Sequence, residues 1–463
     1  MSGRLELLRP QIQPALDDDF RPAVLANQNF RAQTASTGVP FVIGLERCNG
    51  GISRFEGNVF SEKHPNAAAN LDYIERLVKF LLWQRGAFRL YIGAPREIGE
   101  YISRCYAPDG KRRFDHQFMG EQVYEQPFQV VVCAPEDVPA TSDTGILLGR
   151  HLNGCRIGFD LGASDRKVSA VVDGKVVFSE EVVWEPRKHT DPDYHYREIV
   201  SALKRAAREI SRVDAIGGSS AGIYIDNRPM VASLFRSVPK ERFGEVRNLF
   251  LRIREEFGVP LEVINDGDVT ALAGSMSIGE NGILGIALGS SEAAGYIDLE
   301  GRITGWLNEL AFAPIDYSPN APVEEWSGDR GCGSSYLSQA YVFRMAPKVG
   351  IEIPADITDA DKLKFVQEKL ETGHAGAVKI WQSMGISLGY ALAHYADFYD
   401  IRHVLILGRC TSGRGGDLLL TSAQNVFKTE FPNLYKKIVL HLPDENVRRI
   451  GQSVAAASLP VLD

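Results

Sequence analysis

The sequence lacks the features that mark several large classes of protein. Its six cysteines are scattered, with no CxxC pair, so no disulfide framework or cysteine-rich metal site is expected, and reduced thiols in the cytoplasm fit this pattern. No segment reaches the roughly 18 to 20 apolar residues of a membrane span, and the first residues lack the apolar core of a signal peptide. No GxxxxGK[ST] sequence occurs, which disfavours a P-loop nucleotidase. We therefore expect a cytoplasmic protein with no membrane partner.

Positively charged residues are fewer than negatively charged ones. The 463 residues include 51 Lys and Arg against 59 Asp and Glu, a formal net charge of −8. Affinity for a nucleic-acid backbone comes from clustered Lys and Arg, so no nucleic-acid partner is expected. With 44% hydrophobic and 24% charged residues, the composition is that of a globular protein long enough for two or three domains.

Hydrophobic periodicity divides the chain into four expected parts. Residues 1–40 show little periodicity and are interpreted as an N-terminal arm. Residues 41–150 are expected to form an additional α/β region, residues 151–270 an N-terminal lobe and residues 271–463 a C-terminal lobe. Apolar residues at helical spacing predict helices at Leu71 to Trp83, Tyr196 to Ile210, about Ala360 to Tyr399 and near Glu445 to Ala457.

The region 41–150 contains short segments whose sequences are similar to segments of the region after it. VIGLERCNGGIS resembles RIGFDLGASDRKVS, and NVFSE resembles VVFSE. We interpret this as a degenerate duplication of a ββ(β)αβ unit. The first copy has Glu46 where the second has Asp160, but a bulky Arg47-Cys48 replaces Leu161-Gly162. The first copy is therefore expected to be structural.

A strand, an acid and a turn of small residues stand together in the second copy. Apolar residues up to Phe159 precede Asp160, and the turn Gly162-Ala163-Ser164 leads into a returning strand. Small residues let backbone N–H groups approach an anion, and the neighbouring acid can hold a metal ion that shares the anion's charge. This pattern suggests a nucleotide-phosphate site. An ordinary hairpin with an exposed Asp is the alternative.

Two further strand ends carry polar residues. VDAIGGSSAGIY places Ser219 and Ser220 in a turn of very small residues, and LEVINDGD delivers Asn265 and Asp266. Open α/β sheets bind ligands at the carboxyl ends of their strands. There, a carboxylate can accept the proton of a substrate hydroxyl while the amide orients another hydroxyl. The alternatives are a close-packed strand end and a helix N-cap, a role that Asp268 fits better than Asp266.

A fourth segment repeats the small-residue hairpin. GILGIALGSSEAAGYID contains the turn Gly289-Ser290-Ser291, and a later strand ends in Gly408-Arg409. Two such hairpins with an acid-bearing strand between them predict a nucleotide cleft.

These motifs resemble the actin-like ATPase and sugar-kinase superfamily, and within it the ROK family of sugar kinases and regulators, over roughly residues 155 to 460. IGFDLGAS is similar to the first phosphate motif, VINDGDVTALAG to the catalytic-Asp segment and LGSSEAAGYI to the second phosphate motif. ITGWLNELAFAP is similar to the sugar-binding segment, and LILGRCTSGRGGD to the adenosine-side turn. The resemblance implies a two-lobed actin-like (ribonuclease H-like) α/β fold, here with an extra N-terminal α/β region.

The resemblance also implies roles for single residues. Asp266 would be the catalytic base, with Asn265 and Glu309 on the sugar. Asp160 would act on Mg²⁺ through water. The remaining implied contacts place the ATP phosphates and adenosine near Gly162, Ala163, Ser164, Gly289, Ser290, Ser291, Gly408 and Arg409, with Ser219 and Ser220 on the substrate side. Homo-oligomerisation is a further expectation from the family.

The sequence departs from the family pattern in four respects. Phe312 stands where the family has a zinc-binding His, and GDRGCGSSYLSQ retains only Cys332 of the cysteine motif. A single thiol cannot make a tetrahedral site, so no zinc is expected. Ser334 replaces a sugar-binding Glu, and Ser291 stands where Gly is common.

We favour an ATP-dependent sugar kinase that phosphorylates a hydroxyl of a hexose or hexose derivative in a cleft between two lobes. Two alternatives stay open. A non-catalytic sugar or nucleotide sensor is favoured by Phe312 and Ser334, and an ATPase with another acceptor is allowed because fold alone does not fix function. The N-terminal region has no helix-turn-helix pattern, which weakens a transcription-factor interpretation.

Overall fold

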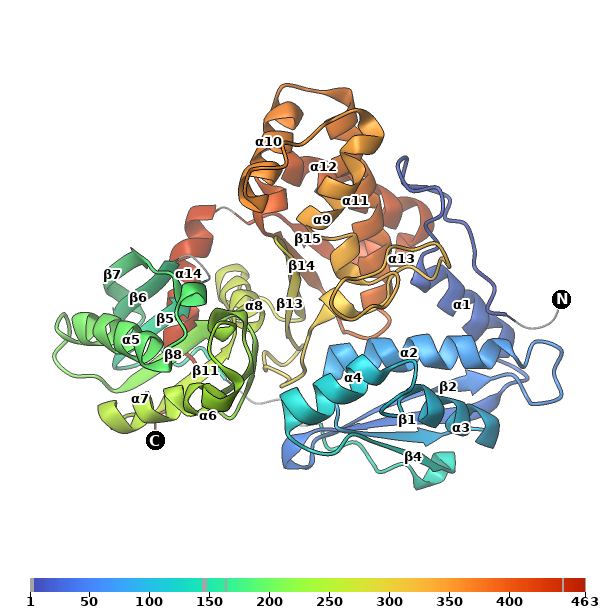
Figure 1. Cartoon of the computed structure of the whole chain (residues 1–463), viewed down its shortest axis with the longest axis horizontal. Coiled ribbons are helices and arrows are strands. Elements are labelled where there is room, and N and C mark those ends of the chain that lie inside the picture. The colour runs from blue at the N-terminus through green and yellow to red at the C-terminus, as the bar shows by residue number, and fades with distance from the viewer. Residues whose placement is uncertain (1–3, 144–147, 163–164, 444, 463) are drawn as a thin grey trace. The chain divides into compact units, whose positions relative to one another are not determined.

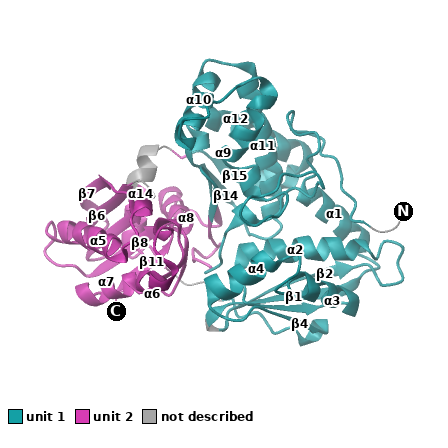
Figure 2. Cartoon of the chain, in the orientation of Figure 1, with its two compact units in different colours: residues 1–144, 286–294, 305–442 teal, residues 145–285, 295–304, 443–463 magenta. Residues whose placement is uncertain are grey.

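The computed structural model describes residues 4–143, 148–162, 165–443 and 445–462, which form two compact units (Figures 1 and 2). Unit 1 comprises residues 1–144, 286–294 and 305–442, and unit 2 comprises residues 145–285, 295–304 and 443–463. The chain therefore passes between the units several times, and its last segment returns to unit 2.

Unit 2 is built on a five-stranded sheet with the order β11-β8-β5-β6-β7. The hairpin β5–β6 and the pair β6–β7 are antiparallel, whereas β8 and β11 run parallel to β5. Every residue of β5 is buried, as expected of a central strand covered on both faces. The strands are β5 (Cys155–Leu161), β6 (Asp165–Val172), β7 (Lys175–Val183), β8 (Ala215–Ser220) and β11 (Leu261–Asn265), with a ribbon of β9 (Ile223–Ile225) and β10 (Arg228–Val231) beside them.

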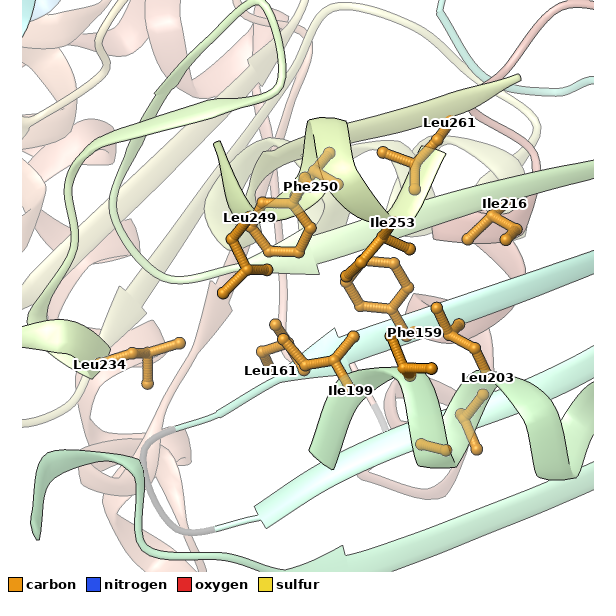
Figure 3. Packing of buried hydrophobic residues seen from close by; sticks show 14 of the residues in the cluster. Phe159, Leu161, Ile199, Leu203, Ile216, Leu234, Leu249, Phe250, Ile253 and Leu261 are labelled. Carbon is orange, nitrogen blue, oxygen red and sulfur yellow. The ribbon is translucent and has the colours of Figure 1, made fainter. Parts of the chain in front are cut away.

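Helices cover both faces of this sheet. Helices α5 and α7 pack on one face and enclose an apolar core. The residues of this core include Phe159, Leu161, Ile199, Leu203, Phe250 and Ile253 (Figure 3). On the other face α14 lies so close that a Cβ at Gly158 or Gly217 would overlap its backbone carbonyls. The helices are α5 (Pro192–Ala207), α6 (Phe243–Arg247), α7 (Leu249–Phe257), α8 (Asp266–Ile278) and α14 (Glu445–Ala457). The predicted helices at Tyr196 to Ile210 and Glu445 to Ala457 are confirmed.

A second sheet has the order β13-β12-β14-β15. Its strands are β12 (Ile283–Leu288), β13 (Glu292–Ile297), β14 (His403–Leu407) and β15 (Val439–His441). The associated helices are α9 (Gln339–Met345), α10 (Asp359–Glu371), α11 (Ala375–Tyr395), α12 (Arg414–Glu430) and α13 (Pro432–Lys437). The predicted helical region is thus two helices, and Gly385 and Gly389 of α11 lie against α12, as their size predicts.

The N-terminal α/β region of unit 1 has a four-stranded sheet with the order β2-β1-β3-β4. Its elements are β1 (Val39–Glu46), β2 (Ile52–Val59), α2 (Ala69–Arg85), β3 (Arg89–Gly93), α3 (Arg96–Cys105), α4 (Arg113–Gln117) and β4 (Gln129–Cys133). Here β3 runs antiparallel to β1, whereas β8 runs parallel to β5. The predicted duplication is therefore wrong: a hairpin without a third strand sends the helix connection back in the opposite direction.

Part of the predicted arm is a packed helix, α1 (Ala23–Thr34). Its Phe30 ring stacks on Tyr73 of α2 with 4.0 Å between ring centroids. The buried face also contains Asn27 and Thr34 among small residues, which weakens the apolar periodicity on which helix prediction depends. The residues before α1 pack against a distant part of the same unit, since Ile12 N donates to the Tyr390 hydroxyl of α11 at 3.3 Å.

Candidate active site

Three parallel strands of unit 2 end in polar residues at one edge of the sheet. The register pairs Asp160 of β5 with Ser219 of β8, and Ser220 of β8 with Asn265 of β11. The structure therefore brings together the three strand ends that the sequence singled out. This edge is where open α/β sheets bind ligands.

Asp160 is buried and hydrogen-bonded across the strands. Its Oδ1 accepts the Ser219 hydroxyl at 2.7 Å. Burial raises the pKa of Asp160 above its ordinary value, although the Ser219 hydrogen bond and the charge of Lys167 act in the opposite direction. The side chain is thus an oriented acid rather than the exposed Asp of an ordinary hairpin.

Lys167 is a member of this site that the sequence analysis missed. Its Nζ lies 3.9 Å from Asp160 Oδ2 and 3.6 Å from Asp165 Oδ1. Lys167 is the direct register partner of Asp160 in the hairpin. Counting back along the predicted hairpin would have found it. A cation here can neutralise phosphate charge as well as the acids.

Asn265 caps helix α8. Its Oδ1 accepts Gly267 N at 2.7 Å, and its Nδ2 donates to Gly222 O at 2.7 Å. The helix N-cap that the sequence left open as an alternative is therefore Asn265 and not Asp268, whose carboxylate accepts Tyr296 N at 3.1 Å. A carboxamide has a second N–H and a second lone pair, so Asn265 can still meet a hydroxyl.

Asp266 is the first residue of α8 and directly follows the end of β11. Desolvation, and then the negative charge of Asp160, raise the pKa of Asp266 to about 6, while the N–H of Gly267 opposes the shift. Behind it, the Tyr224 hydroxyl donates to Ser220 Oγ at 2.6 Å. A carboxylate with this pKa is ionised at neutral pH and is a stronger base than an exposed Asp.

The two small-residue hairpins close in the same way. Gly162 N donates to Asp165 O at 2.9 Å, and Gly289 N donates to Ser291 O at 3.0 Å. These two N–H groups are therefore used within the turns. Ser290 and Ser291 are exposed. Ala163 and Ser164 lie outside the described residues.

The Gly408 turn lies beside the Gly289 turn in unit 1. Gly408 has φ +98°, and a Cβ there would overlap the backbone of Leu288, the last residue of β12. Thr411 Oγ1 donates to Gly408 O at 2.7 Å, and the Arg409 side chain is exposed. Only a glycine permits this close approach of the two strand ends.

The segment that carries Glu309 is also in unit 1. Glu309 is half-buried and follows Asn308, which has φ +53°. Phe312 packs on Trp83, with ring centroids 4.4 Å apart, and burial raises the pKa of the Cys332 thiol to about 12. Within residues 4–143, 148–162, 165–443 and 445–462, no group of three or more His, Cys, Asp or Glu is arranged to hold a metal ion.

Glu292 is a buried acid beside the second small turn that sequence reasoning also missed. Its Oε1 accepts the Tyr395 hydroxyl at 2.9 Å, and its Oε2 lies against Gly333. Burial raises the pKa of Glu292 to about 8. Gly333 leaves room for this carboxyl group. The sequence alone does not show that Gly333 lies opposite Glu292, so this site could not be predicted.

Solved structures with a similar fold include a ROK family transcriptional regulator, a homologue of the E. coli MLC protein. It is 18% identical with a TM-score of 0.51, and the match covers 66% of this chain and 79% of that one. The fold is that of the ROK proteins. A ROK hexokinase from Thermus thermophilus (19% identity, TM-score 0.49; 65% and 97% covered) and a ROK family glucokinase from Streptomyces griseus in complex with glucose and AMPPNP (20%, 0.48; 65% and 99%) also match.

The comparisons by sequence found no match. No protein-family model and no curated protein sequence matches the chain. Among the described residues, no helix is long and apolar enough to cross a membrane.

Proposed function

We propose that the protein is an ATP-dependent sugar kinase that transfers the γ-phosphoryl group to a hydroxyl of a hexose or hexose derivative. The observation that carries this proposal is Asp266, whose pKa is raised to about 6 at the strand edge shared with Asp160 and Asn265. Such a base is matched to a hydroxyl substrate at neutral pH.

In the proposed reaction, the substrate hydroxyl loses its proton to Asp266 as its oxygen bonds to the γ-phosphorus. The bond from the γ-phosphorus to the β–γ bridging oxygen breaks, and that oxygen leaves with ADP. Asn265 and Glu309 orient other hydroxyls of the sugar. Little covalent chemistry is asked of the protein, which supplies positioning and charge neutralisation.

The donor set at Asp160 fits Mg²⁺. This ion is commonly held by one or two carboxylates, with water and substrate phosphates completing the coordination. Asp160 offers one carboxylate, fixed by Ser219 at 2.7 Å, and Lys167 beside it would pair with phosphate. When bound with ATP, Mg²⁺ supplies charge neutralisation on the phosphates. The turns at Gly162, Gly289 and Gly408-Arg409 are assigned to ATP.

A non-catalytic sugar or nucleotide sensor is the second candidate function. It is favoured by the similarity to a structure described as a transcriptional regulator, and by Phe312 and Ser334 at two positions of the family's sugar and zinc motifs. A sensor would bind sugar without sugar-dependent turnover of ATP. The two candidates therefore differ in a measurable product.

The test is ADP release with Mg-ATP across a panel of hexoses and N-acetylhexosamines. The wild type and Asp266→Asn are compared, with Glu46→Gln as the matched acid-to-amide control in the N-terminal sheet. We expect at least one sugar to stimulate the wild type and Glu46→Gln but not Asp266→Asn. Sugar binding without stimulation favours the sensor, and equal sugar-independent turnover in the wild type and Asp266→Asn contradicts both a kinase and a base role for Asp266.

A further inference from the structure

We propose that helix α2 of the N-terminal region positions Glu309, with Lys79 and Tyr399 acting as positioning residues for the substrate. The inference rests on the proposed function, in which Glu309 binds a sugar hydroxyl. Helix α2, Tyr399 and the segment 305–332 all belong to unit 1. It gives the additional N-terminal region a role in substrate binding.

The end of α2 is hydrogen-bonded directly to the backbone of the segment 305–332. Asn308 N donates to Gln84 O at 2.9 Å, and Glu309 N donates to Trp83 O at 3.0 Å. The last carbonyls of a helix have no partner within the helix and need one outside it. Residues 308–309 therefore complete α2, and α2 fixes the backbone of Glu309.

Asn308 is held in a conformation that few residues adopt. Its φ of +53° lies in the left-handed region, and the residue is buried. The Tyr399 hydroxyl donates to its Oδ1 at 2.9 Å. Backbone strain of this kind persists where the surroundings over-determine it, and it concentrates at binding and catalytic sites.

A buried ion cluster joins α2 to the other end of the segment. Lys79 Nζ lies 2.6 Å from Asp115 Oδ1, and Asp329 lies 3.2 Å from Arg76 and 2.9 Å from Arg112. Lys79 is completely buried. The members of this α2 ion cluster are Glu75, Arg76, Lys79, Arg112, Asp115 and Asp329. Moving Asp329 would leave the three largely buried cations Arg76, Lys79 and Arg112 with only two acids, Glu75 and Asp115, which holds residue 329 against α2.

Trp83 connects the ion cluster to Glu309. Its Nε1 donates to Asp115 Oδ1 at 2.6 Å, the same oxygen that pairs with Lys79. Its ring packs on Phe312, and Phe312 N donates to Glu309 O at 3.2 Å. A change at Lys79 thus reaches Glu309 through Asp115, Trp83 and Phe312.

The first test variant combines Lys79→Met with Asp115→Asn, so that neither charge is left unpaired and Trp83 keeps an acceptor. Tyr399→Phe is a milder variant that removes only the hydroxyl bonded to Asn308. Arg31→Met is the control, because its ion pair with Asp397 and its hydrogen bond with Tyr73 lie outside the α2 ion cluster. We expect both test variants to raise the KM for sugar, by roughly 10- to 100-fold for the double variant, with kcat retained. Arg31→Met changes stability and leaves KM unaltered.

Hydrogen exchange gives a second measurement that does not depend on turnover. Residues 305–312 should exchange faster in the double variant than in the wild type, while residues 261–278 of unit 2 keep their wild-type rates. Unchanged exchange in residues 305–312, or faster exchange with unchanged KM in both test variants, overturns the inference. A wild type without sugar-dependent turnover overturns the proposed function instead, and the exchange comparison still decides whether α2 holds the segment.

Discussion

Each unit contains a hairpin whose first strand ends in an acid, and the two acids have different surroundings. In unit 1, Glu46 Oε2 accepts Arg89 NH1 at 2.9 Å and the Tyr91 hydroxyl at 2.8 Å. In unit 2, Asp160 accepts a hydrogen bond from the Ser219 hydroxyl and lies 3.9 Å from Lys167 Nζ, and its charge helps to raise the pKa of Asp266. Strand β3 beside β1 thus supplies two large side chains that bind Glu46 directly, whereas β8 beside β5 supplies the small Ser219, and Lys167 of β6 lies farther away, 3.9 Å from Asp160 Oδ2.

The turns after these acids differ in the same sense. Arg47 follows Glu46 and pairs with Asp143 and Ser53. Gly162 follows two residues after Asp160 and has no side chain. An acid at a strand end becomes a candidate site where neighbouring strand ends bring small hydroxyl residues and a second acid. Substitution of these acids one at a time distinguishes the two arrangements.

The largest effect is expected from Asp266→Asn. Removing a general base lowers turnover by roughly 10²- to 10⁴-fold. In the wild type, kcat/KM should fall below about pH 6, because protonation of Asp266 removes the base. Steady-state rates of sugar-dependent ADP release between pH 5 and pH 8 (about the span in which such a group titrates) measure both. Turnover of Asp266→Asn within about twofold of wild type would contradict the role of Asp266 as a base.

Asp160→Asn should lower turnover by roughly 100-fold, as the loss of one electrostatic stabiliser does. It should also move the acid limb of kcat/KM to lower pH, because the charge of Asp160 is one of the causes that raise the pKa of Asp266. The pH profile of the residual activity checks this. An acid limb that moves to higher pH would contradict the proposed electrostatic coupling.

Gly217→Ala tests how closely α14 packs on the sheet of unit 2. The new Cβ would overlap the carbonyl oxygen of Ala456, a backbone atom. We expect a loss of roughly 1–3 kcal/mol in the free energy of unfolding, measured with urea. Gly44→Ala in β1 is the counterpart, since its Cβ would lie 2.8 Å from a side-chain atom of Val138 that can move. An equal or larger loss at Gly44 would contradict the packing difference.

The smallest effect is expected from Glu46→Gln. The variant keeps the shape of the side chain and loses a partly exposed charge pair with Arg89. Such pairs are worth about 0–1 kcal/mol, so stability should change little and sugar-dependent turnover should not change. Thermal unfolding and the ADP-release assay check both. A loss of turnover comparable to that of Asp160→Asn would show that the first sheet also carries a site.

The sequence was sufficient to predict the ROK-like α/β fold and the strand ends that meet at Asp160, Ser219 and Asn265. Small residues and apolar runs are local signals, so β5, β8 and β11 could be located directly. The relative direction of two strands is not encoded by a local pattern. The sequence similarity around Glu46 suggested a duplication that the antiparallel pairing of β1 with β3 rules out.

Contacts between distant segments could not be predicted. Lys167 follows from hairpin register, but Glu292 against Gly333 and Trp83 against Phe312 depend on tertiary packing. Helix α1 escaped detection because Asn27 and Thr34 lie on its buried face. The partner of Asp268 could not be predicted either, because Asp268 is in helix α8 and Tyr296 is on strand β13.

The central claim is that Asp266 accepts the proton of a sugar hydroxyl during phosphoryl transfer from ATP. Mass spectrometry of the sugar after incubation with Mg-ATP measures this most directly, in the wild type and in Asp266→Asn. The account predicts a phosphorylated sugar, in equal amount to ADP, from the wild type and almost none from the variant. Unmodified sugar accompanied by ADP and inorganic phosphate, or equal product from both proteins, would contradict it.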